Sequence, residues 1–168
     1  LKLPPQGLGV TVEEGLTRYV FTPSETLKAD TNYELVVSGA RDADGVPVET
    51  SSLSVKTVAA PAVVRFRPRA DAKDVGREAA ISVRFTRSMD QASTKAAFKV
   101  TADGKQIDGK VRFAEKSTVL VFEPAKKLPY DAKVVATVAA SARSAEGSSL
   151  TKSAKATFQT EEKPKPKP

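Results

Sequence analysis

The sequence contains no cysteine, no histidine and no tryptophan among its 168 residues, and it contains a single methionine. Without cysteine there is no disulfide framework and no thiolate nucleophile. Without histidine there is no imidazole to act as a general base near neutral pH or as a metal ligand. These absences argue against the commonest catalytic and transition-metal sites, and we predict no cofactor, no metal and no enzymatic activity.

Long apolar runs are missing as well. No stretch approaches the roughly 18 consecutive apolar residues that a membrane helix needs, and the first residues, LKLPPQGLGV, have no apolar segment typical of a signal peptide. We therefore expect no membrane insertion. The chain is 40% hydrophobic, which is enough for a globular core. It starts at a leucine, and we expect it to be a piece of a longer protein.

Charge is unevenly distributed along the chain, whose net charge is +7. Residues 1–59 carry five basic and eight acidic side chains, a net charge of −3. Residues 60–160 carry 19 basic and ten acidic side chains, a net charge of +9. The basic character therefore belongs to the second part of the chain.

One phrase of the sequence occurs twice. Residues 21–35 read FTPSETLKADTNYEL, and residues 122–136 read FEPAKKLPYDAKVVA. A gap-free alignment at a constant offset of 101 pairs Phe21 with Phe122 and Leu27 with Leu128. A period near 100 residues predicts tandem copies of a whole domain.

The two copies differ in length, because residues 61 to about 105 have no counterpart ahead of the first copy. We expect the missing strands in a preceding segment of a longer protein. Without them the first sheet would keep open edges and an uncovered apolar face, so we expect residues 1–57 to be poorly stable alone.

Apolar residues in the second copy alternate with polar ones, which is the period of a half-buried strand. Ile81, Val83 and Phe85 follow this pattern, and the same alternation predicts that Val64 and Phe66 point inward. About seven short strands with turns between them predict an all-β fold of two packed sheets. Six phenylalanines fall on predicted inward positions: Phe66, Phe85, Phe98, Phe113, Phe122 and Phe158. A single short helix is expected after Asp90, whose carboxylate would cap it.

Several of these segments together resemble the bacterial Ig-like domains that occur in tandem in secreted and cell-surface proteins. The matching features are FTRSMD at residues 85–90, the Phe-x-Val strand at 98–100, the DG turns, and Phe-x-Pro at 122–124 followed by Leu128. The resemblance implies tandem immunoglobulin-like β-sandwiches and export to the cell surface or the medium. It also implies that Met89 fills the edge of the core, and it carries over no catalytic residue.

This resemblance divides the chain into three parts. Residues 1–59 are expected to be the later part of a first Ig-like domain, residues 60–160 a complete one, and residues 161–168 a Lys/Pro-rich linker tail. The expected partners are neighbouring domains of the parent chain.

Two smaller patterns invite functional interpretations. Asp42 and Asp44 are spaced like calcium ligands, but a hairpin turn that uses Gly45 explains the same residues and is favoured. A sugar-stacking shelf is one interpretation of Tyr19, Tyr33 and Tyr130, but Tyr33 falls in an inward phase, so a core or corner role is favoured. Serine and lysine are abundant, so composition alone leaves a Ser–Lys nucleophile open.

Five cations, on three predicted strands, occupy the outward phase of the alternation and would share one sheet of an Ig-type sandwich: Arg65, Arg67, Arg84, Lys110 and Arg112. Such a face would bind an anionic wall polymer or polysaccharide. A solvated outer face that protects sheet edges is the favoured alternative. No aromatic residues interleave with the cations, so we expect no specific nucleic acid as partner.

Three functions are compatible with this sequence. The first is a non-catalytic extracellular spacer or presentation module of a larger bacterial protein. The second is an adhesion module that binds an anionic polymer through the basic face. The third is a pair of domains that shapes substrate access in a larger enzyme.

Overall fold

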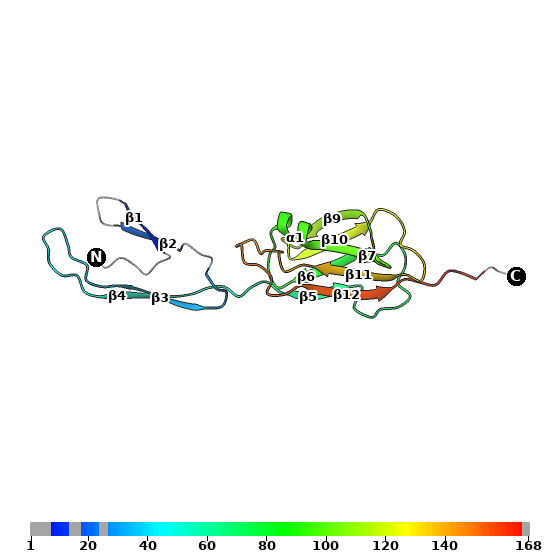
Figure 1. Cartoon of the computed structure of the whole chain (residues 1–168), viewed down its shortest axis with the longest axis horizontal. Coiled ribbons are helices and arrows are strands. Elements are labelled where there is room, and N and C mark those ends of the chain that lie inside the picture. The colour runs from blue at the N-terminus through cyan, green and yellow to red at the C-terminus, as the bar shows by residue number, and fades with distance from the viewer. Residues whose placement is uncertain (1–7, 14–17, 24–26, 166–168) are drawn as a thin grey trace. The chain divides into compact units, whose positions relative to one another are not determined.

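The computed structural model describes residues 8–13, 18–23 and 27–165 (Figure 1). The chain divides into two compact units, residues 1–59 and residues 60–168. The described residues form β-strands and one short helix, so the prediction of an all-β fold is confirmed. No helix in the described part of the chain is long and apolar enough to cross a bilayer.

The second unit is a sandwich of two antiparallel four-stranded sheets. Its strands are β5 (Val63–Arg67), β6 (Ile81–Phe85), β7 (Phe98–Ala102), β8 (Lys105–Gln106), β9 (Gly109–Ala114), β10 (Val119–Pro124), β11 (Lys133–Val138) and β12 (Ala154–Gln159). One sheet has the order β5-β6-β10-β9 and the other the order β12-β11-β7-β8. The predicted sandwich is therefore confirmed, with the two-residue β8 as an addition to the seven expected strands.

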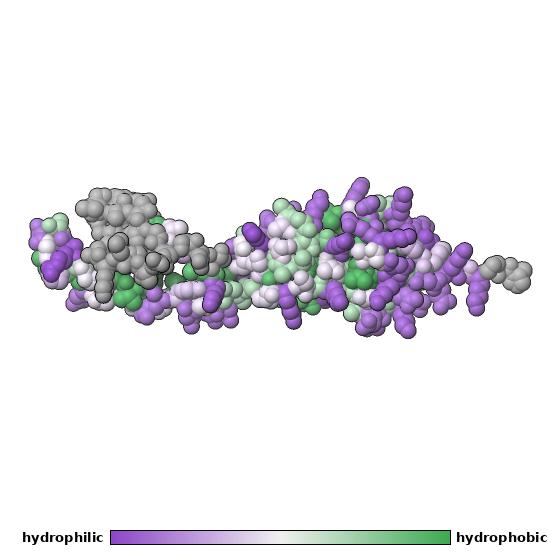
Figure 2. Space-filling view, in the orientation of Figure 1, coloured by the Kyte–Doolittle hydropathy of each residue, from purple (hydrophilic) through white to green (hydrophobic). Residues whose placement is uncertain are grey.

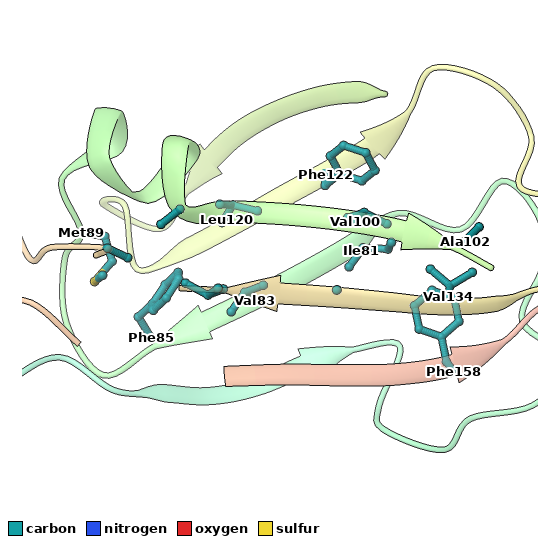
Figure 3. Close-up of a cluster of buried hydrophobic side chains, with 14 of the residues drawn as sticks. Ile81, Val83, Phe85, Met89, Val100, Ala102, Leu120, Phe122, Val134 and Phe158 are labelled. Carbon is teal, nitrogen blue, oxygen red and sulfur yellow. The ribbon is translucent and has the colours of Figure 1, made fainter. Parts of the chain in front are cut away.

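The core lies between the two sheets and takes every second residue of the central strands. Figure 3 shows Ile81, Val83 and Leu120 of one sheet and Val100 of the other among the buried side chains of this core. Of the six predicted inward phenylalanines, Phe85, Phe122 and Phe158 are buried, and the other three are partly buried and pack against the core. Burial of this apolar surface stabilises the unit by about 25 cal/mol for each Å² removed from water.

The first strand of the sandwich departs from the simple alternation. The pairing of β5 with β6 shifts between Val63 and Arg65, so Val64 is an extra residue in a bulge. Val63 packs against the core, and Val64 is exposed. The prediction of an inward Val64 is wrong, because a bulge reverses the direction of the side chains on one side of it.

The predicted helix is α1 (Gln91–Ala97). It begins after Asp90, whose carboxylate accepts a hydrogen bond from the backbone amide of Ser93 at 2.8 Å. Met89, just ahead of the cap, is buried in the core. Both residues of the Met-Asp pair therefore have the structural roles that the family resemblance implied.

The described strands of the first unit form two hairpins: β1 (Leu8–Glu13) with β2 (Arg18–Pro23), and β3 (Asn32–Val37) with β4 (Ser51–Lys56). These hairpins have the strand lengths and registers of β9–β10 and β11–β12. Asn32 pairs with Lys56, as Lys133 pairs with Gln159. That the first unit is the later part of another Ig-like domain nevertheless stays a prediction.

The end of the second unit lies further along the chain than the last strand. Val75 accepts a hydrogen bond from the amide of Glu161 at 2.9 Å, and the carboxylate of Asp131 accepts one from the amide of Lys163 at 3.3 Å. Residues 161–163 of the predicted linker tail are therefore attached to the sandwich.

Candidate functional site

The five predicted cations lie on the outer face of the β5-β6-β10-β9 sheet. Arg65 of β5 is directly opposite Arg84 of β6, and residues directly opposite each other in a sheet point to the same face. Arg67 of β5 is opposite Ser82 of β6, and Ser82 is opposite Val121 of β10. Val121 in turn is opposite Arg112 of β9, so Arg67 and Arg112 point to the same face. Lys110 lies two residues from Arg112 along β9 and so shares its face. We refer to this surface, which carries Arg65, Arg67, Arg84, Lys110 and Arg112, as the basic face.

Two valines lie in the middle of the basic face, on the central strand β10. Val119 and Val121 point outward, yet both are buried. Val119 is opposite Arg84, and Val121 is opposite Arg112. Long arginine side chains cover apolar neighbours with their methylene groups while the charged end stays in water. Part of the basic character of this face therefore serves to cover an outward apolar strip.

Glutamates hold the same two arginines in place. The Arg84 guanidinium lies 2.6 Å from both carboxylate oxygens of Glu115. Arg112 Nε donates to Glu123 Oε1 at 3.0 Å. The sequence interpretation missed both carboxylates, although the alternation of β10 places Glu123 in the same outward phase as Val121. Exposed ion pairs of this kind contribute little stability, but they lower the charge available to a ligand.

The other three cations of the basic face differ from this pair. Arg65, Arg67 and Lys110 are exposed, and none has an acidic partner at ion-pair distance among the residues that the structure describes. Arg65 also has a like charge, Arg84, directly across the sheet. Like charges opposite each other in a sheet are destabilising, and the Glu115 carboxylate paired with Arg84 offsets part of that repulsion.

The outer face of the second sheet is basic too. Lys99 of β7 and Lys155 of β12 are both opposite Thr137 of β11 and are exposed. They have the same charge as Arg65 and Arg67 but belong to the other side of the sandwich. This pair gives a matched reference for any effect of the basic face.

The Asp42–Gly45 loop has the geometry of a turn. Asp42 Oδ1 accepts hydrogen bonds from the amides of Asp44 at 3.0 Å and Val46 at 2.8 Å. Gly45 has a φ of +84°, which glycine adopts without strain. The Asp42 carboxylate thus caps the turn, as the hairpin interpretation requires. Within the described ranges, no group of three or more acidic residues is arranged to hold a metal ion.

Two of the three tyrosines have contacts within the described part of the chain. The Arg77 guanidinium stacks on the ring of Tyr130, with its carbon 3.8 Å from the ring centroid, so one ring face is already occupied. The Tyr33 hydroxyl accepts a hydrogen bond from the Lys28 amide at 2.9 Å. The side chain of Tyr19 lies outside the described part of the chain.

The carboxyl groups with displaced pKa values have surface roles. A hydrogen bond and the positive charge of Lys127 lower the pKa of Glu78, and hydrogen bonds from Ser93 lower the pKa of Asp90. A lowered pKa keeps a carboxyl group ionised, which is the opposite of what a general acid needs near neutral pH.

Comparisons with known proteins agree with this architecture. The profile of a bacterial Ig-like domain family matches residues 57–160. An S-layer protein from Geobacillus stearothermophilus is 38% identical over 82 residues, which is 48% of this chain and 7% of the relative's length. The chain thus corresponds to a small part of that relative.

A solved structure has the same fold. The methionine-rich copper resistance protein PcoC from Escherichia coli matches 61% of this chain over its full length, with a TM-score of 0.50 and 20% identity. At that identity the likeness concerns the fold alone. The S-layer protein SbsC matches 64% of this chain over 14% of its own length, with a TM-score of 0.45 and 18% identity. From the profile match and the sandwich architecture it follows that the chain belongs to the bacterial Ig-like domain family.

Proposed function

We propose that this chain is a non-catalytic spacer or presentation module of a bacterial cell-surface or secreted protein. The observation that carries the proposal is the closed sandwich of the second unit, whose core residues are sealed between two sheets. In addition, the chain resembles part of an S-layer protein, and such a relative is itself a surface protein. Figure 2 shows hydrophilic side chains over most of the visible surface of the second unit.

The mechanism of such a module is geometric. A sandwich that buries Ile81, Val83, Leu120 and Val134 behaves as one rigid body. Domains placed before and after it are therefore held apart by a fixed length, which a flexible linker does not provide.

A distance measurement tests this function. The substitutions Ala60→Cys and Lys163→Cys allow a donor and an acceptor fluorophore to be attached at the two ends of the second unit, and single-molecule energy transfer gives the distribution of end-to-end distances. The reference is a Gly/Ser linker with the same number of residues, whose end-to-end distance varies widely. We expect one narrow distribution for the folded chain and a broad one for Leu120→Asp, which breaks the core. A distribution as broad as that of the Gly/Ser linker would contradict the spacer function.

The basic face supports a second candidate, the binding of an anionic wall polymer or polysaccharide. The specific observation is the exposure of Arg65, Arg67 and Lys110 on one face, none of them with an acidic partner among the described residues. Binding through such a face is electrostatic and weakens as salt screens the charges. By analogy with polyphosphate chains, about three contacting cations predict a loss of affinity of roughly tenfold or more for a fourfold rise in salt.

Matched charge reversals separate this candidate from a general effect of net charge. Teichoic acid is the probe, and its affinity is measured for the unmodified chain, for Arg65→Glu/Arg67→Glu and for Lys99→Glu/Lys155→Glu. The two double variants change the net charge equally, but on opposite sheets. Binding through the basic face predicts loss in the first variant only. Equal loss in both variants, or no binding at low salt, would count against it.

A further inference from the structure

The two units share a pattern of threonine hydrogen bonds in addition to their hairpins. The Thr160 hydroxyl oxygen accepts from the Ala132 amide at 2.9 Å and donates to the Pro129 carbonyl at 2.7 Å. In the first unit the Thr57 hydroxyl oxygen accepts from the Thr31 amide at 2.9 Å and donates to the Lys28 carbonyl at 2.6 Å. Position by position, β3 and β4 therefore correspond to β11 and β12.

Corresponding apolar residues have very different exposure in the two units. Leu128 is 1% exposed and Leu27 is 40% exposed. Phe158 is 2% exposed, whereas Val55 at the same register position of β4 is 45% exposed. Ala156 is 3% exposed, whereas its counterpart Leu53 is 58% exposed.

Two of these exposed residues, Leu53 and Val55, share one face of the β3–β4 hairpin with the half-buried Tyr33 and Leu35. Leu35 is opposite Leu53, and Tyr33 is opposite Val55, so the four side chains share a face. Hydrophobic surface is visible where this hairpin lies in Figure 2. We call this surface, made of Tyr33, Leu35, Leu53 and Val55, the open face. An apolar surface of this kind is normally covered in a soluble protein.

The second unit shows what covers the corresponding surface. Strand β6 pairs with β10 and contributes Ile81, Val83 and Phe85 to the core, and β7 pairs with β11 and contributes Val100 and Ala102. Figure 3 shows Ala102 near Val134 and Phe158 of the β11–β12 hairpin, and the other four side chains further along the same core. One segment thus supplies a strand to each sheet, joined through α1.

A residue ahead of β6 in the same segment secures the loop before β11. The Leu128 amide donates to the Arg77 carbonyl at 2.9 Å, and Arg77 Nε donates back to the Leu128 carbonyl. The Arg77 guanidinium also stacks on Tyr130. Leu27 is strongly exposed, and among the described residues its backbone has no hydrogen bonds that correspond to these.

We infer that the open face binds a polypeptide segment that resembles residues 60–107. The segment would stand before β1 in the sequence, just as residues 60–107 stand before β9. The segment would pair one strand with β2 and one with β3, and so complete an Ig-like sandwich. A second copy of the chain is a poorer occupant. The occupant must supply two connected strands, one for each sheet, and the exposed β3–β4 hairpin of a second copy does not supply them. The net charges of the two segments are complementary. Residues 60–106 carry ten basic and five acidic side chains, whereas residues 1–59 have a net charge of −3.

An extended chain tests the inference. Residues 60–107 are duplicated and joined directly before residue 7, which keeps the offset of 101 between the copies. Hydrogen–deuterium exchange is then measured for the amides of β3 and β4 in the extended and the unmodified chain. Completion of the sandwich predicts exchange about 100-fold slower or more in the extended chain, because opening these strands would then require unfolding of a core.

Substitutions in the added copy alone provide the control. Val83→Asp places a charge at a buried position and should abolish the slow exchange, whereas Ser82→Asp on the outward side of the same strand should retain it. The original second unit is unchanged in both variants, so its own slow exchange confirms that the chain is folded. Unchanged exchange in β3 and β4 of the extended chain would overturn the inference.

Two further measurements cover the remaining outcomes. Co-expressed as a separate polypeptide, the 60–107 segment should co-purify with the chain, and its Val83→Asp form should not. Sedimentation of the unmodified chain examines self-association: a dimer with protected β3 and β4 amides that dissociates in Leu53→Asp would show that a second copy covers the open face. That result, or failure of the segment to co-purify, would also overturn the inference.

Discussion

The hydroxyl group of Thr160 and the backbone of Ala132 are joined by a hydrogen bond of 2.9 Å from the Ala132 amide to the Thr160 oxygen. Both residues are buried, and the Thr160 amide donates to the Ala132 carbonyl at 3.1 Å. These bonds connect the residue after β12 to the residue before β11, at the edge of the core. They satisfy backbone groups that would otherwise be buried without a partner.

Thr160→Val should therefore destabilise the second unit by about 1–3 kcal/mol, because valine has the same shape but leaves the buried Ala132 amide unpaired. Denaturant unfolding of the full chain measures this free energy. Thr57→Val is the matched control: it removes the corresponding hydroxyl in the first unit and should leave the unfolding of the second unit unchanged. A loss below about 0.5 kcal/mol for Thr160→Val would mean that the hydrogen bonds do not stabilise the edge.

Much of the sandwich could be predicted from sequence, because burial between two sheets imposes a period of two on the side chains. Ile81, Val83 and Phe85 show this period without interruption. Val64 does not, since the bulge at this position depends on the pairing of β5 with β6, which a single strand's sequence does not reveal. The helix cap at Asp90 was predictable because it is a local interaction.

The candidate site was predictable in its position but not in its electrostatics. Alternation places Arg84 and Arg112 outward, and the sheet order then brings them to one face. Their ion pairs with Glu115 and Glu123 depend on which strands are neighbours, so they follow from tertiary structure alone. The burial of the outward Val119 and Val121 has the same origin, because neighbouring side chains cover them.

Leu120→Ala should destabilise the second unit by about 2–5 kcal/mol, since Leu120 is fully buried between the sheets and its removal leaves a cavity. Val64→Ala, which truncates an exposed residue of the bulge, should change the free energy of unfolding by less than about 0.5 kcal/mol. Calorimetry of both variants measures the difference. Similar losses in the two variants would place the core elsewhere.

The ionisation of Asp90 should make the stability of the second unit depend on pH in the acid range. Its pKa is lowered from the ordinary value of 3.8 by hydrogen bonds from Ser93, so the folded state favours the ionised carboxylate. This stabilisation is present above the ordinary pKa and is lost as the pH falls through the lowered pKa of the folded state. The melting temperature of the second unit should therefore fall between about pH 5 and about pH 2.

Asp90→Asn tests the assignment, because asparagine also caps a helix but does not titrate. The variant should fold and show a shallower decline of melting temperature in this range. Some decline should persist, since the pKa of Glu78 is lowered as well by its hydrogen bond to Lys127. An identical acid profile for Asp90→Asn and the unmodified chain would show that Asp90 makes no contribution.

Gly109 begins β9 at a point where a side chain has no room. A Cβ atom there would lie 2.5 Å from two ring atoms of Phe122 and still closer to the backbone carbonyl of Glu123. Because Phe122 is buried in the core, it cannot move away without disturbing its neighbours. Gly109→Ala should therefore destabilise the second unit by about 1–3 kcal/mol.

Gly76→Ala is the control, because a Cβ at Gly76 meets no atom within 4 Å and its φ is not positive, so this variant should be neutral or slightly stabilising. Thermal unfolding of both variants measures the contrast, and a Gly109→Ala variant as stable as Gly76→Ala would show that β9 shifts away from Phe122 at little cost.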